Sequence, residues 1–526
     1  MKKAVKCVRI IAVNFDLNYY FMADKRQVAL IVLDGWGYRE DKEHNAVAEA
    51  ATPFFDGLWQ KYSPTLLLAS GESIGLPAQQ MGNSEICHMT IGAGTVIFSD
   101  LLRINKNIEN GEFFSNPVIS QLLEEVKRKD SNLHLLGLLG PGGVHSHSDH
   151  LFALIEAGKK AGVKNIYLHL FLDGRDTPPQ SAGTFAKILE EKMAEIGAGE
   201  VATMGGRYWG MDRDNNWDRV AKAEAAIFDG VGKLVKNQKP SEILSQLYAS
   251  GEKDEFIEPI ILVTDDETPR TIQANDGIFF FNFRPDRARM LSQKILAKQK
   301  EMNWNFATMT EYDSAFSCPA AYPRLEIKTC LAKEVAEAGL SQAHIAETEK
   351  FAHATYFLNG GRQEPYEGER DILIESRKDV KTHDEAPQMR AREIADKAIE
   401  EIKAGTDFIF INFANPDMIG HTGNVAAIKE ALTFVDEQLR RVVEALDAVG
   451  GVAFITADHG NAELNVDQAT GEVHTAHTTN LVPAIVTDKN AEILQGALFD
   501  VAPTVLALMG LAKPESMTGN NLLVEL

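Results

Sequence analysis

The 526-residue sequence predicts an α/β fold with more than one domain. Strand-like apolar runs alternate with amphipathic helical stretches along the chain, which is the pattern of α/β proteins. A chain of this length also exceeds the usual size of a single domain. Three of the apolar runs lead into acidic residues, and these runs lie near the two ends of the chain. The sequence therefore predicts one α/β domain assembled from both chain ends, with a second α/β domain inserted into it.

The three runs near the chain ends predict a metal site. Residues 28–33 lead into Asp34, residues 408–413 lead into Asp417 with His421 four positions later, and residues 452–456 lead into Asp458 and His459. Open α/β sheets place ligands beyond the carboxyl ends of their strands. Carboxylates and imidazoles are also the side chains that divalent cations prefer. We therefore expect these side chains to meet around metal.

More than one ion is expected at this site. His474 and His477 add imidazoles shortly before another predicted strand. Together with the strand-end residues they provide enough groups for two ions, an arrangement that suits phosphoryl transfer. Taken alone, an Asp at a strand end is more often a helix N-cap, and a buried His is usually just hydrogen-bonded. Four such segments at strand termini favour the metal interpretation.

A serine and a lysine are candidates for chemistry beside the metal. Ser84 opens a predicted helix over 85–90. On local sequence it would be an ordinary N-cap, but beside two metal ions a serine hydroxyl can become a nucleophile. Lys350 lies in Glu347-Thr348-Glu349-Lys350, where a solvated lysine is the simplest local interpretation. Whether Ser84 and Lys350 take part in chemistry therefore depends on which residues surround them in the fold.

The middle of the chain predicts an anion-binding surface. Predicted strands at 133–139, 165–172, 201–204 and 278–283 are each followed by a loop that carries Arg or His. A single loop Arg is usually solvated, but several at neighbouring strand ends suit a phosphate or carboxylate. The residues concerned are His145, Arg175, Arg207, Arg213, Arg284 and Arg287, with Asp176 in the same loop as Arg175.

Composition narrows the class of partner. Lys and Arg number 53 and Asp and Glu number 75, which gives a net charge of −22. This argues against a nucleic acid or an anionic membrane as the partner. The four cysteines form no C-x-x-C pair, and no apolar run approaches the roughly 20 residues of a membrane-spanning helix. We expect a cytoplasmic monomer that acts on a small molecule.

The N-terminus carries an extension that is unlike a signal peptide. Residues 1–21 contain a short apolar stretch that is broken by Lys6, Arg9, Asn14 and Asp16. A signal peptide would need a longer uninterrupted apolar region and a cleavage site of small residues. We expect Met22 to be the natural start and residues 1–21 to be an upstream extension.

The order of these motifs resembles the cofactor-independent phosphoglycerate mutases of the alkaline phosphatase superfamily. The resemblance extends from about Val28 to Leu523. Each motif alone is moderately specific, but together they leave little room for another family. The motifs are Leu33-Asp34-Gly35-Trp36-Gly37, Met81-Gly82-Asn83-Ser84-Glu85, Gly142-Gly143-Val144-His145, Asp173-Gly174-Arg175-Asp176, Gly206-Arg207-Tyr208, Met211-Asp212-Arg213-Asp214, Arg284-Pro285-Asp286-Arg287, Glu347-Thr348-Glu349-Lys350, Asn415-Pro416-Asp417, Asp458-His459-Gly460-Asn461 and Thr475-Ala476-His477-Thr478.

The resemblance implies a reaction and its metals. It implies two divalent ions, with manganese expected, and no 2,3-bisphosphoglycerate. One ion would be held by Asp417, His421 and His477. The other would be held by Asp34, Ser84, Asp458 and His459. The reaction implied is the interconversion of 3-phosphoglycerate and 2-phosphoglycerate in glycolysis and gluconeogenesis, through a phosphoserine intermediate at Ser84.

The resemblance also implies the substrate contacts and the domain limits. Asp176 would be the general acid/base, Lys350 would stabilise the transferring charge, and Arg284 and Arg287 would hold phosphate. The glycerate end would be held by His145, Arg175, Arg207 and Arg213. Residues 22–99 and 319–526 are expected to form the phosphatase-like metal domain, and residues 100–318 the inserted substrate-binding domain. The alternative is a metal-dependent phosphatase or another mutase of the superfamily; a non-catalytic metal-binding protein is a more distant possibility.

Overall fold

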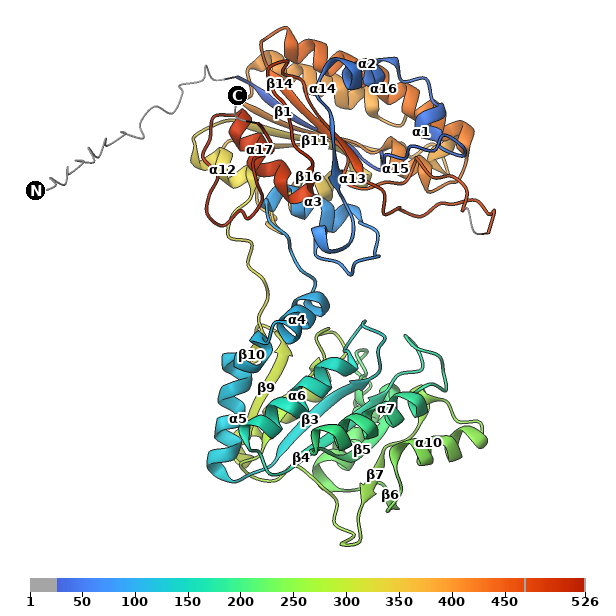
Figure 1. The fold of residues 1–526 in the computed structure, drawn as a ribbon, viewed down its shortest axis with the longest axis vertical. Helices are drawn as coiled ribbons and strands as arrows, with labels where there is room; N and C mark the ends of the chain where they lie inside the picture. The colour runs from blue at the N-terminus through green and yellow to red at the C-terminus, as the bar shows by residue number, and fades with distance from the viewer. Residues whose placement is uncertain (1–25, 468–469, 525–526) are drawn as a thin grey trace, which may run out of the picture. The chain divides into compact units, whose positions relative to one another are not determined.

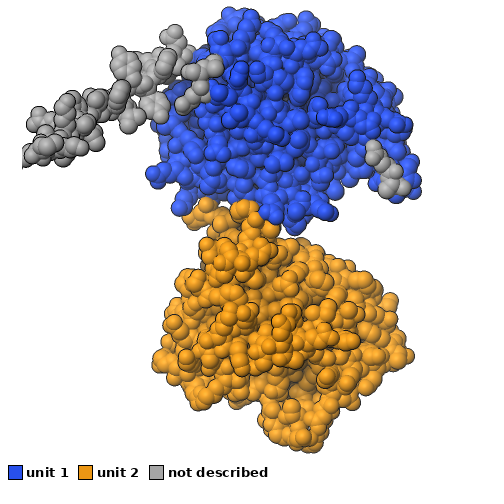
Figure 2. All heavy atoms as spheres, viewed as in Figure 1, with its two compact units in different colours: residues 1–97, 327–526 blue, residues 98–326 orange. Residues whose placement is uncertain are grey.

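Two compact units make up the protein in the computed structural model, which describes residues 26–467 and 470–524. Unit 1 joins the two chain ends, residues 1–97 and 327–526, and unit 2 is the continuous stretch 98–326 between them (Figure 2). One α/β unit is thus inserted into another, which confirms the predicted fold class. The first division falls two residues before the expected limit and the second falls eight residues after it. The expected upstream extension, residues 1–21, lies outside the described residues.

Unit 1 is built on an eight-stranded, mostly parallel sheet (Figure 1). Among its described strands, β15 alone runs antiparallel to its neighbours, β14 and β2. The central strands are buried along their whole length, which explains their continuous apolar sequences. The strand order is β12 (Glu369–Ile374), β11 (Gln342–Glu347), β13 (Phe408–Phe413), β1 (Val28–Leu33), β14 (Val452–Thr456), β15 (Val482–Val486), β2 (Thr65–Leu68) and β16 (Gly496–Ala497).

The three strands predicted to lead into carboxylates are neighbours in this sheet. β1 lies between β13 and β14 and is parallel to both. Leu33, the last residue of β1, pairs with Phe413, the last residue of β13, and Val32 pairs with Thr456, the last residue of β14. The loops that carry the predicted ligands therefore begin side by side at one edge of the sheet.

Helices cover both faces of the unit 1 sheet (Figure 1). The longest, α16 (Val425–Asp447), has a buried stripe at helical spacing that includes Ile428, Leu432, Val435 and Leu439. Neither α16 nor any other helix within 26–467 and 470–524 is long and apolar enough to cross a membrane. The other helices of the unit are α1 (Ala46–Glu49), α2 (Pro53–Lys61), α3 (Ser84–Ala93), α12 (Leu331–Glu337), α13 (Thr348–Ala352), α14 (Ala391–Ala404), α15 (Asn415–Gly420) and α17 (Val501–Leu508).

Unit 2 also has an eight-stranded sheet with helices on both faces (Figure 1). One apolar core contains Leu122, Leu154 and Leu189, and a second contains Val220 and Leu291. The strand order is β10 (Ala320–Tyr322), β9 (Asn305–Thr310), β8 (Gly277–Phe280), β3 (Leu133–Leu139), β4 (Ile166–Leu172), β5 (Glu200–Gly206), β7 (Ile260–Val263) and β6 (Lys233–Lys236). The helices are α4 (Asp100–Glu109), α5 (Pro117–Lys129), α6 (Ser148–Ala161), α7 (Ala182–Ile196), α8 (Arg207–Gly210), α9 (Trp217–Glu224), α10 (Pro240–Ala249) and α11 (Arg289–Met302).

Candidate active site

The loops after β1, β13 and β14 meet closely because glycine follows Asp34. Gly35 has a positive φ of 79°, which favours glycine over other residues. A Cβ atom added to it would lie 2.7 Å from the Asp417 Cα. The Gly35 carbonyl accepts hydrogen bonds from the backbone amides of Asn461 and Ala462, both at 3.0 Å. The loop after β1 is therefore fixed against the loops after β13 and β14.

Ser84 is the first residue of α3 and lies at the edge of the same cluster. The helix is capped by Asn83, whose side chain accepts from the Ile86 amide at 3.0 Å, so Ser84 is not needed as the N-cap. Ser84 is 6% exposed. Its Oγ lies 2.9 Å from His459 Nε2 and accepts a hydrogen bond from Lys350 Nζ at 2.6 Å. The hydroxyl is thus aimed at the cluster.

Lys350 is buried among the carboxylates, in contrast to the solvated lysine that its local sequence suggests. It belongs to α13, the short helix that follows β11, and is 4% exposed. Its Nζ donates to Asp34 Oδ1 and Asp417 Oδ2, both at 2.7 Å. Burial alone would lower its pKa, but the charges of Asp34 and Asp417 outweigh burial and raise it. Lys350 is therefore held as an ammonium.

One set of possible metal ligands consists of Asp417, His421 and His477. Asp417 Oδ1 lies 3.3 Å from His421 Nε2 and 3.2 Å from His477 Nε2, and the two Nε2 atoms are 3.1 Å apart. Each ring donates its Nδ1–H to a backbone carbonyl, His421 to Thr475 and His477 to Gly82. Metal-binding histidines are usually oriented in this way by their second nitrogen. The three ligand atoms are thus placed to share one ion.

A second set consists of Asp34, Asp458 and His459, with Ser84 beside them. His459 Nε2 lies 3.3 Å from Asp458 Oδ2 and 3.9 Å from Asp34 Oδ1. Asp458 Oδ1 accepts from the amides of Gly35 and His459. Its buried Oδ2 accepts no hydrogen bond from any residue that the structure describes. A bound cation would satisfy this buried carboxylate oxygen.

The charge of the cluster also fits bound cations. Asp34, Asp417 and Asp458 are at most 2% exposed. Among the described residues, Lys350 is the one lysine or arginine paired with them. Burial and the neighbouring Asp458 raise the pKa of Asp34, which shows that the carboxylates repel one another. Buried charges need compensation, so the residues present fit bound divalent cations.

Sequence analysis missed several residues that orient the ligands. His88, one helical turn after Ser84, is fully buried, and its Nδ1–H donates to the Ser84 carbonyl at 2.9 Å. Asn412, within β13, donates to Asp34 Oδ2 at 2.8 Å, and Asn461 donates to Asp417 Oδ1 at 3.0 Å. His88 could have been found from its i+4 spacing to Ser84. The two asparagines carry no local signal of this kind.

The predicted cationic residues of unit 2 also share one edge of a sheet. The strands β8, β3, β4 and β5 are parallel neighbours, so the loops that follow them begin side by side. The structure brings all seven predicted residues of this unit to these loops or to the short helix α8: His145, Arg175, Asp176, Arg207, Arg213, Arg284 and Arg287.

Arg207 is the buried centre of this cluster. It is the first residue of α8 and is 2% exposed. Its Nη1 donates to Asp173 Oδ1 and Asp176 Oδ2, both at 2.5 Å. Although burial raises the pKa of Asp176, the Arg207 hydrogen bond and charge lower it overall. Asp176 is thus held as a carboxylate, the form that can accept a proton.

Two arginines and a histidine gather around Asp286. Arg213 Nη1 lies 2.9 Å from Asp286 Oδ2, and Arg284 Nε lies 3.1 Å from Oδ1. His145 is 3% exposed and its Nδ1 lies 3.7 Å from the same Oδ1. Burial and the Arg207 charge lower the pKa of His145 to about 4, so the ring is neutral at pH 7. A neutral imidazole can donate to or accept from a hydroxyl group.

The two remaining arginines complete the cluster. Arg175 is half-exposed and pairs with Glu255 at 3.2 Å. Arg287 donates to the Met211 carbonyl at 3.1 Å, and burial together with the charge of Arg207 lowers its pKa. Crowded cations of this kind gain stability when an anion binds among them. The cluster is therefore suited to an anionic ligand.

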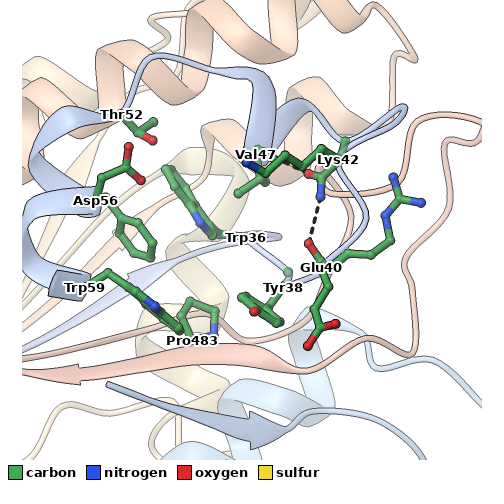
Figure 3. A pocket seen from close by; sticks show the side chains of 14 residues that line it. Trp36, Tyr38, Glu40, Lys42, Val47, Thr52, Asp56, Trp59 and Pro483 are labelled. Atoms are coloured by element: carbon green, nitrogen blue, oxygen red, sulfur yellow. Dashed lines mark hydrogen bonds between the residues drawn. The ribbon is translucent and has the colours of Figure 1, made fainter. Parts of the chain in front are cut away.

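A separate pocket of unit 1 is lined in part by residues 36–40, which follow Asp34 in the chain (Figure 3). Its volume is about 320 Å³, and its walls include Trp36, Tyr38 and Trp59. Tyr38 and Trp59 stack with their ring centroids 5.7 Å apart. None of the predicted site residues, all of which the structure describes, lines this pocket. The pocket is thus distinct from the metal cluster.

Known proteins resemble this chain along nearly its whole length. It is 45% identical to the 2,3-bisphosphoglycerate-independent phosphoglycerate mutase of Syntrophotalea carbinolica, over 95% of this chain and 98% of that protein. It is 46% identical to phosphoglycerate mutase 1 of the same type from Methanosarcina acetivorans, over 95% and 99%. The chain belongs to the 2,3-bisphosphoglycerate-independent phosphoglycerate mutase family.

Family models and a solved structure agree with this membership. Residues 104–314 match the model of the N-terminus of these mutases, and residues 285–504 match the type I phosphodiesterase / nucleotide pyrophosphatase model. A crystal structure of the Leishmania mexicana phosphoglycerate mutase at low cobalt concentration is 30% identical, with a TM-score of 0.53 over 95% of this chain and 98% of that one. The predicted family resemblance is confirmed. As a member of this mutase family, the chain is an isomerase with candidate metal-ligand groups in unit 1.

Proposed function

We propose that this chain interconverts 3-phosphoglycerate and 2-phosphoglycerate through a phosphoserine at Ser84, without 2,3-bisphosphoglycerate. The observation that carries the proposal is the placement of the Ser84 hydroxyl, which contacts both Lys350 and His459 beside three buried carboxylates. Family membership gives the substrate, because the relatives are named for it.

The metal ligands would be the two sets described above. Asp417, His421 and His477 would hold one ion, and Asp34, Asp458, His459 and Ser84 the other. Two divalent ions, when bound, supply Lewis-acid stabilisation and lower the pKa of a coordinated hydroxyl. Lys350 would stabilise the charge on the phosphoryl oxygens, since it is a buried ammonium that contacts Ser84.

The reaction balances with one acid/base group. The Ser84 oxygen forms a bond to phosphorus while the bond from phosphorus to the substrate C3 oxygen breaks. Ser84 would react as its alkoxide, because bound divalent ions lower the pKa of a coordinated hydroxyl. The Asp176 carboxylate passes the proton of the C2 hydroxyl to the departing C3 oxygen. The C2 oxygen then attacks the phosphorus of phosphoserine, and the Ser84 oxygen leaves as the alkoxide again. Its carboxylate is held by Arg207, which supports this role.

The cationic cluster of unit 2 would bind the rest of the substrate. We assign the glycerate carboxylate and hydroxyls to His145, Arg175, Arg207 and Arg213, and the phosphoryl group to Arg284 and Arg287. Retaining glycerate while its phosphoryl group is on Ser84 is what separates a mutase from a phosphatase. A metal-dependent phosphatase is the alternative function, since unit 1 alone contains the groups that hydrolysis requires.

The test is incubation with 3-phosphoglycerate and Mn²⁺, without 2,3-bisphosphoglycerate, while 2-phosphoglycerate and free phosphate are both measured. We expect 2-phosphoglycerate, and we expect Ser84→Ala to lower turnover by about 10⁴-fold or more. Ser73→Ala is the control, because the Ser73 hydroxyl donates to the Ser70 carbonyl and should leave turnover unchanged. Free phosphate without 2-phosphoglycerate would establish the phosphatase instead.

The finer assignments are also proposals. We propose that two manganese ions are bound and that the protein is a cytoplasmic monomer with no nucleic acid or membrane partner. Oxygen and nitrogen ligands bind several divalent metals, so availability decides the occupant. Metal content measured on protein purified from its native cells tests the identity and number of the ions. Light scattering measures the mass and tests whether the protein is a monomer.

A further inference from the structure

Glu463 is a buried carboxylate beside the metal-ligand loops that the proposed chemistry does not use. It lies four residues after His459 and is 0% exposed. Among the described residues, no Lys, Arg or His lies within ion-pair distance of its side chain. A buried carboxylate without a cation is costly unless several donors satisfy it. The burial of this carboxylate therefore requires a structural or functional explanation.

Three donors from two separate segments converge on this carboxylate. Oε2 accepts from the Asn461 backbone amide at 2.8 Å. Oε1 accepts from the Thr478 hydroxyl and from Asn480 Nδ2, the latter at 2.8 Å. Asn461 follows His459 by two residues, and Thr478 follows His477 directly. Glu463 thus joins the segment that carries one predicted ligand to the segment that carries another.

A third segment is built around the same side chain. A Cβ atom on Gly37, three residues after Asp34, would lie 2.2 Å from the Glu463 carboxyl carbon. A Cβ atom on Gly460 would lie 2.4 Å from its Oε1. Arg39 Nε donates to the Glu463 carbonyl at 3.1 Å. The loop after β1 therefore packs directly on Glu463, and any side chain at Gly37 would displace it.

The contacts of Glu463 bear on both predicted ligand sets. His459 and His477 stack with their ring centroids 3.7 Å apart, although they belong to different sets. Their relative position depends on the junction between Gly460 and Thr478, where the Thr478 amide donates to the Gly460 carbonyl at 3.0 Å. Glu463 holds both sides of that junction. Movement of its carboxylate would change the spacing of the two histidines.

We propose that Glu463 is a positioning residue that sets the affinity of both metal sites by fixing the loop of His459 against the loop of His477. Among the described residues, Glu463 belongs to no group of three or more His, Cys, Asp or Glu side chains that could hold an ion. The inference rests on the proposed metal ligands, but it does not depend on which reaction follows. Groups that orient metal ligands typically contribute 10- to 100-fold in metal affinity.

The test is the affinity of Glu463→Gln for Mn²⁺, measured by titration calorimetry on the full-length, metal-depleted protein. A glutamine keeps the shape but directs an NH₂ group at one or two of the three donors. We expect both sites to bind Mn²⁺ about 10- to 100-fold more weakly. Glu472→Gln is the matched control, since Glu472 is exposed in the same loop, and it should bind as the wild type does.

A milder variant keeps the test decisive if Glu463→Gln does not fold. Thr478→Val removes one of the three donors and retains the carboxylate, and we expect binding to weaken several-fold. The thermal midpoint of each metal-free variant is measured in parallel. Wild-type affinity in either folded variant would overturn the proposal. If the wild-type protein itself binds no Mn²⁺, the proposed metal site fails instead, so the two failures are distinguishable.

Discussion

Both units bury a cluster of histidine and aspartate, yet the two clusters differ in whether their polar atoms are satisfied. In unit 2, Thr203, His169, His134 and Asp276 form a continuous chain across the sheet, with successive distances of 3.0, 2.9 and 3.0 Å. Neutral rings satisfy every link, since each imidazole donates one proton and accepts another. This cluster resembles the interior of an ordinary α/β protein.

The cluster in unit 1 is incomplete by the same measure. Asp458 Oδ2 and His459 Nδ1 are buried without a hydrogen-bond partner among the described residues. The unit 1 cluster also lies at strand ends, whereas His134 and His169 of unit 2 lie within strands β3 and β4. Burial of titratable groups therefore does not distinguish a functional site from a structural one. The informative features are the unsatisfied ligand atoms and the position beyond the strand ends.

Metal removal should have the largest effect, and it should change the stability of unit 1 but not that of unit 2. A ligand present at 1,000 times its Kd stabilises the folded state by about 4 kcal/mol. We expect chelation to abolish turnover and to speed hydrogen exchange in β1, β13 and β14, while exchange in β3, β4 and β5 is unchanged. Mass spectrometry of exchanged peptides measures the exchange in both units. Equal changes in the two units would contradict the assignment of metal to unit 1.

Replacing Lys350 tests the charge of the unit 1 cluster. Lys350→Met keeps much of the side-chain volume but removes the ammonium that contacts Asp34, Asp417 and Ser84. Loss of one group that stabilises transition-state charge typically lowers turnover by about 10²- to 10³-fold. Steady-state kinetics at saturating Mn²⁺ measure this. As a control, Lys333→Met, which alters a partly exposed lysine paired with Glu337 at 3.6 Å, should retain normal turnover.

The difference between the clusters also explains what could be predicted from sequence. The strands β1, β13 and β14 are continuous apolar runs because parallel central strands are buried on both faces. The polar residues that follow these strands can therefore be predicted from the sequence as candidate metal ligands. The α/β class and the insertion follow from the same runs. The antiparallel β15 is also visible as the predicted strand that follows His477, whereas the two-residue strand β16 is too short to leave a pattern.

Residues that act through tertiary contacts could not be predicted in this way. Lys350 is flanked by Glu349 and looks solvated, and only the packing of α13 brings it to Asp34 and Asp417. Asn412 and Asn461 contact Asp34 and Asp417, which are far away in sequence, through single hydrogen bonds. Glu463 joins two separate segments through bonds to Asn461, Thr478 and Asn480. No local period or composition reports such bonds. The family motifs identified Lys350, because a motif preserves the outcome of tertiary contacts.

Replacing Arg207 tests whether the unit 2 cluster acts on the substrate alone. Arg207→Lys removes the planar guanidinium that contacts Asp173 and Asp176, and arginine and lysine are not interchangeable at such sites. A change in a buried hydrogen-bonded charge pair costs about 2 kcal/mol or more, which is about 30-fold in kcat/KM. We expect the affinity for Mn²⁺ to stay unchanged. Weaker Mn²⁺ binding would show that the clusters are not separable.

The smallest expected effect concerns the satisfied cluster of unit 2 and its response to pH. Burial, together with the neighbouring His134, lowers the pKa of His169 well below its ordinary value. An unfolded chain takes up a proton near pH 6.5, but the buried ring does not, so folding stability falls as pH decreases below about 6.5. One such group contributes on the order of 1 kcal/mol per pH unit.

His169→Gln should flatten this dependence, because glutamine does not titrate. The measurement is hydrogen exchange of β4 under conditions where unit 2 unfolds, at pH 6.5 and 5.5 and with intrinsic exchange rates corrected for pH. We expect wild-type protection to fall by about fivefold more than that of the variant, which corresponds to that 1 kcal/mol. An equal fall in both would mean that His169 accepts a proton in the folded state. The hydrogen-bonded series from Thr203 to Asp276 would then accommodate a charged ring. In that respect it would be similar to the charged cluster of unit 1.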